Sequence, residues 1–233
     1  MALAALALAG CETTEEKSAR LERAAKRSKH VVEASEPLRA LVGAPPSGKV
    51  KVRGTAVVHT AEGTAAVVTV HNLTGSTLHQ IPILIDVRDA AGATLYTNNQ
   101  AGISSSLTSV PSLRAGGTLE WVDDQVQVAG TPASVSAKVG DGHPGGAPAS
   151  LPVSASVSEQ NANGGTVEGT VTNPRGTAQQ EVLVYATASH VGHVVAAGRA
   201  LLSEVPAGGS SHFQLFLIGD PAGATLRYVA ATG

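Results

Sequence analysis

The sequence has one cysteine, few aromatic residues and little charge. A single cysteine in 233 residues excludes an intramolecular disulfide. Aromatic residues make up 3% of the chain and charged residues 15%, so a core has to be packed by small and β-branched side chains, which favour strands. The net charge of -2 argues against a protein that binds nucleic acid. No apolar run reaches the roughly 18 residues of a membrane-spanning helix.

Common catalytic motifs are missing as well. The chain contains no GxSxG elbow, no HExxH pair and no P-loop. We therefore expect a protein that is not an enzyme and that uses no cofactor.

The single cysteine follows an apolar amino-terminal segment. Residues 2–10 are wholly apolar, and Leu8-Ala9-Gly10-Cys11 resembles the lipobox of bacterial lipoprotein signal peptides. That resemblance implies that residues 1–10 are a signal peptide, and that Cys11 becomes the lipidated first residue on the extracytoplasmic face of the cell membrane. No Lys or Arg precedes Cys11, so we expect the leader to be truncated or its start to be mis-assigned.

Residues 11–48 have a different composition and are expected to form a lipid-anchored tether, partly helical. On a helix, four basic residues would form one stripe facing membrane lipid or an anionic wall polymer, each adding about 1 kcal/mol near a membrane surface. A solvated tether without a partner is the alternative. Glu36-Pro37 and Pro45-Pro46 are predicted to end the helical tendency and give an extended spacer. The basic stripe consists of Lys17, Arg20, Arg23 and Arg27.

The rest of the chain contains an internal sequence repeat, whose two parts we call the first and the second copy. Asn72 aligns with Asn173, an offset of 173 minus 72, or 101, and Trp121 aligns with Phe213 at 92. Between these positions, residues 83–89 align with residues 183–189 at an offset of 100. The falling offset indicates an insertion in the first copy.

The two copies predict two domains. We place the first at residues 49–139 and the second at 151–233, joined by a Gly/Pro-rich linker at 140–150. Relative motion of the domains is the default expectation. The insertion falls near residues 102–111, where Ser104 to Ser106 indicate a long loop.

Strand patterns set the fold class. Ile81, Ile83, Ile85 and Val87 alternate onto one face, as in a half-buried strand. Hairpin turns are expected at residues 61–63 and 161–165. Six or seven short strands in each copy predict an all-β protein with two tandem immunoglobulin-like β-sandwich domains. Further strands are expected at residues 67–70, 166–171, 194–197 and 213–218.

The order of motifs resembles a known family. A Val-x-Asn strand end, a strand ending in aspartate before a glycine turn, and an Ala-Gly-Gly stretch before an aromatic residue resemble the FxLYD family of Ig-like bacterial domains. Residues 85–89 occupy the motif in the first copy, with Ile for the aromatic and Arg for the tyrosine. Residues 185–189 keep the aromatic in the second copy and lose the aspartate. The layout from Lys49 onward resembles envelope lipoproteins of actinobacteria.

The motif residues have a structural interpretation. Asp89 can cap its own turn, and Asn72 and Asn173 can form Asx turns at strand ends. Trp121 and Phe213 are the natural core aromatics.

Histidines offer the one alternative site. His190 and His193 bracket the hairpin of the second copy, and with His212 they would suit zinc or copper. Exposed turn histidines explain the pattern equally well. Asp123 and Asp124 provide too few oxygens for calcium.

Together these features predict a non-catalytic extracytoplasmic lipoprotein whose tandem domains bind an unknown envelope protein or wall polymer. A metal-binding lipoprotein and a purely structural spacer remain the alternatives, because fold alone separates none of these.

Overall fold

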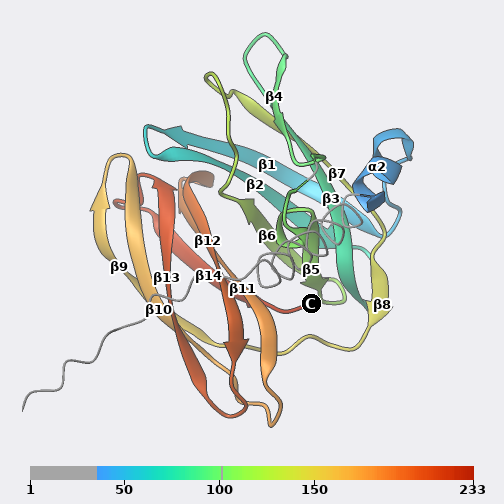
Figure 1. Ribbon diagram of the computed structural model, residues 1–233, viewed down its shortest axis with the longest axis vertical. Coiled ribbons are helices and arrows are strands. Elements are labelled where there is room, and N and C mark those ends of the chain that lie inside the picture. Colours follow the sequence, from blue (N-terminus) through green and yellow to red (C-terminus); the bar gives the residue numbers. More distant parts are fainter. Residues whose placement is uncertain (1–35, 101) are drawn as a thin grey trace, which may run out of the picture.

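A computed structural model describes residues 36–100 and 102–233, and it confirms the all-β class (Figure 1). Besides the strands, these residues form helix α2 (Glu36–Gly43) and one 3-10 turn, η1 (Ser105–Leu107). No helix within them is long and apolar enough to span a membrane. The strands are β1 (Val50–Thr60), β2 (Gly63–Asn72), β3 (Thr77–Arg88), β4 (Thr94–Thr97), β5 (Ser109–Leu113), β6 (Thr118–Asp123), β7 (Ser134–Val139), β8 (His143–Gly145), β9 (Val153–Asn161), β10 (Gly164–Thr172), β11 (Gln179–His190), β12 (His193–Val205), β13 (Ser210–Gly219) and β14 (Thr225–Ala231).

The first sandwich consists of the sheet β1-β2-β6 and a sheet around β3. β3 pairs along its length with β4, β5, β7 and β8. Trp121 is fully buried between the sheets, and its indole N–H donates to the Ser109 carbonyl at 3.2 Å. The predicted alternation on β3 is confirmed, because the four residues expected on its inner face are fully buried: Ile81, Ile83, Ile85 and Val87.

The second sandwich is one six-stranded sheet in the order β14-β11-β12-β13-β10-β9. Only two residue pairs join β12 to β13, Ala196 with Gly219 and Ala197 with Ile218. The sheet can therefore bend there, and side chains from both parts form one core, with Val167, Val184 and Leu217 fully buried in it.

The two copies match at the level of single hydrogen bonds. The Asn72 side-chain amide donates to the carbonyls of Ser76, Leu113 and Arg114 at 2.7 to 3.1 Å. The Asn173 amide makes the same three bonds 101 and 92 residues later at 2.9 to 3.2 Å, to Thr177, Val205 and Pro206. Each Asn Oδ1 also accepts from a backbone N–H two residues on, which confirms the predicted Asx turns.

The 100-residue offset for residues 83–89 is wrong. Ile85 faces the core of the first sandwich, whereas Tyr185 belongs to the other face of β11 and packs with residues of the first sandwich. The residue of β11 that matches Ile85 is Ala186, at an offset of 101. Since side chains alternate along a strand, a slip of one residue exchanges the two faces. Residues 185–189 therefore do not occupy the position of 85–89.

The sandwiches pack sheet on sheet. The face of β1-β2-β6 that points away from Trp121 includes Val67 and Val122, and it lies against the face of β11 and β12 that includes Tyr185 and Ala197; all four belong to one buried cluster. Glu120 on the first face accepts a hydrogen bond from Thr187 on the second at 2.5 Å. The default expectation of relative domain motion does not hold for two sandwiches that share a buried apolar layer.

Helix α2 corrects the expected spacer. The chain is helical from Glu36 to Gly43, and a proline at position 37 is tolerated because the first turn needs no paired N–H. Leu38 and Leu41 form a small buried cluster with Leu84 on the outer face of β3. This part of the expected tether is docked on the first sandwich.

The expected linker is also held in place. Its β8 strand pairs with β3. Asp141 accepts a hydrogen bond from the Ser47 hydroxyl at 2.6 Å and pairs with the Lys49 ammonium at 3.2 Å, and these contacts lower the pKa of Asp141. Arg114 and Arg175, one from each copy, both donate to the Pro148 carbonyl. The domain boundaries themselves stay a prediction.

Candidate functional site

Several predicted site residues lie outside the described residues. Cys11 and the basic stripe, Lys17, Arg20, Arg23 and Arg27, belong to residues 1–35. Lipidation and membrane contact therefore stay predictions.

The structure brings together two of the three candidate metal histidines. His190 and His193 are opposite each other where the β11-β12 hairpin closes, and both are exposed. His212 lies seven residues from Gly219, which pairs with Ala196 of β12 near the hairpin, so an extended strand places His212 about 23 Å from Gly219. Its ring contacts the Thr170 hydroxyl at 3.2 Å. Across 36–100 and 102–233, no three His, Cys, Asp or Glu side chains gather as metal ligands.

A cleft of about 580 Å³ lies where the two sandwiches meet. Most of its lining side chains are uncharged hydrogen-bonding groups, with Glu181 as the acidic one, and four apolar residues complete it. The cleft is lined by Gln80, Pro82, Ser104, Ser105, Ser106, Thr108, Ser109, Pro111, His143, Gln180, Glu181, Leu183, Leu201 and Gly233.

Two matching residues with positive φ reach this cleft, Gln80 of β3 and Glu181 of β11. Neither residue forms a backbone pair with the neighbouring strand, and the strand register is the same on both sides of each. Both have positive φ, 47° and 48°, which is uncommon for residues other than glycine. They are 101 residues apart, so each copy contributes the same positive-φ position to one cleft. Such backbone strain is more frequent at binding sites than elsewhere.

The insertion of the first copy forms one wall of the cleft. The Ser104 hydroxyl caps the turn η1 by accepting from the Ser106 N–H at 3.4 Å. Arg199 of β12 then donates to the Ser106 hydroxyl at 3.1 Å and to its carbonyl at 3.4 Å. The serine loop predicted from the falling offset is therefore fixed to the second sandwich.

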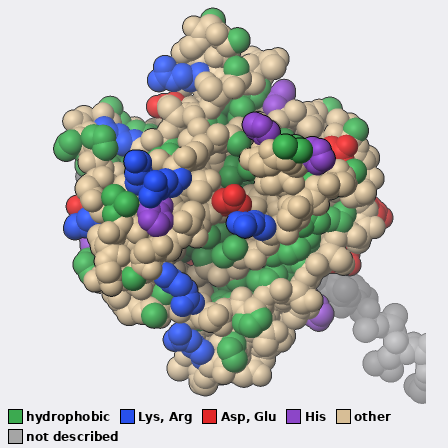
Figure 2. Space-filling view, turned by 180° about the vertical axis from the view of Figure 1, so that it is seen from behind, with side chains coloured by type: hydrophobic (Ala, Val, Ile, Leu, Met, Phe, Trp, Pro, Cys, Tyr) green, Lys and Arg blue, Asp and Glu red, His purple; other side chains and the backbone are tan. Residues whose placement is uncertain are grey.

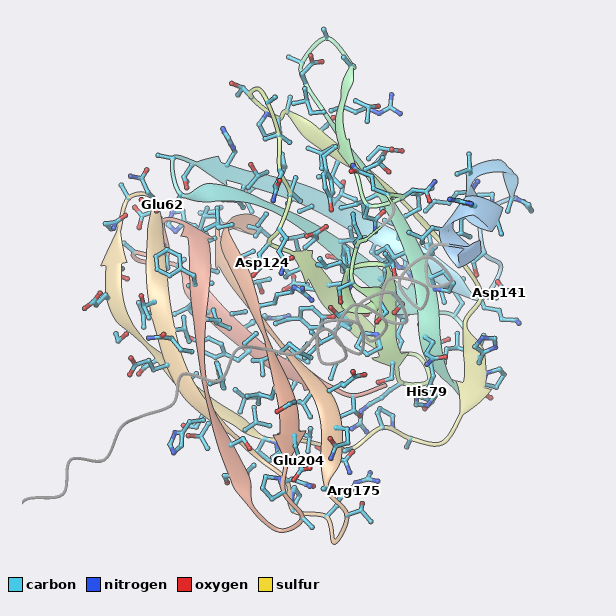
Figure 3. The ribbon with its side chains drawn as sticks, viewed as in Figure 1. Glu62, His79, Asp124, Asp141, Arg175 and Glu204 are labelled. Atoms are coloured by element: carbon cyan, nitrogen blue, oxygen red, sulfur yellow. The ribbon has the colours of Figure 1, made fainter. Side chains whose placement is uncertain are left out.

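An ion pair joins the sandwiches behind this wall. The Arg199 guanidinium lies 3.1 Å from a carboxylate oxygen of Asp124, and the Arg199 backbone N–H donates to the other oxygen at 3.0 Å. Both side chains are mostly buried, at 7% and 17% exposure. Figure 3 shows Asp124 in the middle of the molecule, between the two sandwiches.

The neighbouring Asp123 lies inside the first sandwich. It accepts from the Tyr96 hydroxyl at 3.0 Å and from the Gln125 N–H at 2.9 Å. Burial raises the pKa of Asp123, and burial beside this carboxylate raises the pKa of Tyr96. Both adjacent aspartates are thus engaged in protein contacts.

The cleft was not predicted from the sequence. Gln80, Glu181 and Arg199 stood in no motif. A usable signal was available: Gln80 and Glu181 stand just before the inward alternation of their strands and share the 101-residue offset of the asparagines.

Comparison with known proteins adds little. No family model and no curated protein matches the chain. Among solved structures, red sea bream transglutaminase is similar over 76% of this chain and 29% of its own length, with 14% identity and a TM-score of 0.26. The 7S globulin of Momordica charantia is similar over 77% of this chain and 86% of its own, with 8% identity and a TM-score of 0.12. The chain spans under a third of the transglutaminase, and the resemblance to the FxLYD family stays a prediction.

Proposed function

We propose that this chain is a non-catalytic envelope lipoprotein, anchored through Cys11, whose two Ig-like sandwiches bind an envelope protein as one adaptor unit. The observation that supports this proposal is the cleft between the sandwiches, to which both copies contribute a positive-φ residue at the matching position. The FxLYD-like layout and the lipobox-like start agree with such a role. The basic stripe would add attraction to anionic membrane lipid.

The chemistry of the cleft suits a segment of polypeptide. Serine hydroxyls and the Gln80 and Gln180 amides can donate to and accept from main-chain amides. Leu183 and Leu201 offer apolar surface for an aliphatic side chain, and Leu201 is 53% exposed. Because the walls are fixed by Arg199 and by the shared core, binding would cost little ordering of the protein.

Site-specific photo-crosslinking in cells tests this proposal. A photoreactive residue replaces Ser105 in the anchored protein, and the matched control carries it at Ser134, which is exposed on β7. We expect the Ser105 position to form one discrete adduct with an envelope protein, and the Ser134 position to form none. Equal, diffuse adducts at both positions would contradict the adaptor role and favour a spacer.

Anchoring is tested separately. The wild-type protein should partition into the detergent phase and incorporate a labelled fatty acid, and Cys11→Ala should abolish both. A Cys11→Ala protein that still partitions with detergent would contradict the anchor.

A metal-binding lipoprotein is the second candidate, because His190 and His193 face each other at the hairpin. Native mass spectrometry with zinc or copper, compared with His190→Ala, tests it. A bound ion lost in the variant would favour this role.

A further inference from the structure

The outer strand of the second sandwich, β9, differs from its counterpart β1 in the first. Both strands pair with their neighbour in the same register, Val153 with Val171 and Val52 with Val70. β1 carries Lys51 and Arg53, and Arg53 stands at a bulge. Lysine, arginine and bulges are the devices by which natural proteins keep edge strands from pairing with other chains. β9 has no basic residue, and no Lys or Arg side chain lies at the right margin of Figure 2, the side of β9.

Cover from the facing sheet differs too. In the first sandwich the Thr55 hydroxyl donates to the Val135 carbonyl of β7 at 2.8 Å, which ties β1 to the opposite sheet. The matching residue of β9 is Ala155, opposite Gly169 as Thr55 is opposite Val68. Alanine has no hydroxyl, so this closing bond is absent. In Figure 1, β9 lies at the outer margin of the molecule.

The hydrogen-bonding pattern shows which backbone groups of β9 point away from β10. The Thr172 N–H donates to the Pro152 carbonyl at 3.0 Å, so this pair is hydrogen-bonded. In an antiparallel ladder, hydrogen-bonded and non-hydrogen-bonded pairs alternate. The N–H and C=O groups of Val153, Ala155 and Val157 therefore point away from β10. Beyond them, Ser158 stands at a bulge, because the next paired residue is Glu159.

The side chains of this edge are also suited to pairing. Val153, Ala155 and Val157 are half-buried and pack on the core of the second sandwich. Ser154 and Ser156 alternate with them and are exposed. No charge lies between Val153 and Ser158, so an added strand meets no repulsion there.

We propose that the edge of β9 from Val153 to Val157 binds an extended segment of a partner protein, which joins the sheet as a further strand. Main-chain hydrogen bonds supply the affinity, as in other cases of strand addition. Small apolar residues at every second position of the segment would extend the core beside Ala155, and uncharged polar residues between them would lie beside Ser154 and Ser156. A second copy of this chain is a poorer occupant, because pairing along five residues buries far less than the roughly 1,200 Å² of a stable interface.

The test uses the full chain carrying Cys11→Ser and a short synthetic peptide of alternating Val and Thr with a lysine at each end. Amide hydrogen exchange is measured by nuclear magnetic resonance with and without the peptide. We expect exchange at Val153, Ala155 and Val157 to slow at least tenfold, and exchange along β14 and in the cleft to stay unchanged. Protection elsewhere, no protection at saturating peptide, or protection that appears with protein concentration alone would overturn the proposal.

Two proline variants separate pairing from folding. Ala155→Pro removes an outward N–H and no bond to β10, so it should abolish peptide binding. Ala162→Pro introduces a proline in the β9-β10 turn instead, and this variant should bind the peptide as the parent chain does. If Ala155→Pro binds as well as Ala162→Pro, the proposal is wrong. The proposal shares with the adaptor role only the existence of a protein partner, and a failed Ser105 adduct leaves peptide binding at β9 unaffected.

Discussion

The same sheet face is buried in one copy and exposed in the other. Val67 and Val122 lie on the outer face of β1-β2-β6, where the second sandwich covers them completely. Their counterparts on β10 and β13 are Glu168 and Gln214, which are exposed and bonded to each other at 3.3 Å. The two copies thus keep one backbone pattern while the residues on this face follow what covers it. The two copies therefore pack through different faces, and polar residues on the second copy leave its matching face exposed to solvent.

The strongest test of this comparison exchanges residues between the faces. Val67→Glu would bury an unpaired carboxylate between the sandwiches and should lower the free energy of unfolding by about 4 kcal/mol. Glu168→Val, the reciprocal change, should leave it within about 0.5 kcal/mol because the site is exposed. Denaturant unfolding measures both. Equal effects of the two changes would mean that the faces do not differ in burial.

Removing the ion pair between the sandwiches should have the next largest effect. Arg199→Ala leaves Asp124 without its partner and releases Ser106, so we expect a loss of about 3 kcal/mol. Arg199→Lys keeps the charge without the forked geometry and should recover part of that loss. The same unfolding measurement applies, and a loss under 0.5 kcal/mol, the size of a typical surface substitution, would contradict a joining role.

The two asparagines test whether the copies are equivalent. Asn72→Ala and Asn173→Ala each remove three hydrogen bonds from a buried side-chain amide to backbone carbonyls, and each should cost about 2 kcal/mol. Thermal unfolding of the two variants should give closely similar losses. A large difference would show that the matching bonds do not have matching energetic roles.

The smallest expected effect concerns pH. Asp123 lies where the second copy has Leu215, and its carboxyl is buried. Because burial raises the pKa of Asp123, the folded chain favours the protonated form. The contribution of this group to stability is full below the ordinary pKa of aspartate, and is lost as pH rises through the raised pKa. Asp123→Asn should flatten this decline when unfolding is measured across pH 3 to 7, and an unchanged slope would contradict it.

Local patterns predicted much of the fold. Alternation on β3, the Asx turns of Asn72 and Asn173, and the buried positions of Trp121 and Phe213 follow from period-two burial and from side-chain chemistry. The expectation that the chain is extended after Pro37 failed because the first turn of a helix tolerates proline. The helix also packs on Leu84, which is distant in sequence.

The candidate site could not be predicted from the sequence for a related reason. The cleft combines Gln80, Ser106 and Glu181, which come together only through the packing of the two sandwiches. Nothing local distinguishes Arg199, on a half-buried strand, from an ordinary surface arginine. The free edge of β9 became visible only when its pairing was compared with that of β1.

Calorimetric unfolding of the chain tests most directly whether the two sandwiches form one unit. The shared apolar layer and the Arg199–Asp124 pair predict a single transition whose calorimetric and van't Hoff enthalpies agree. Two separate transitions in the wild-type chain, with a temperature separation that Val67→Glu does not change, would contradict the account.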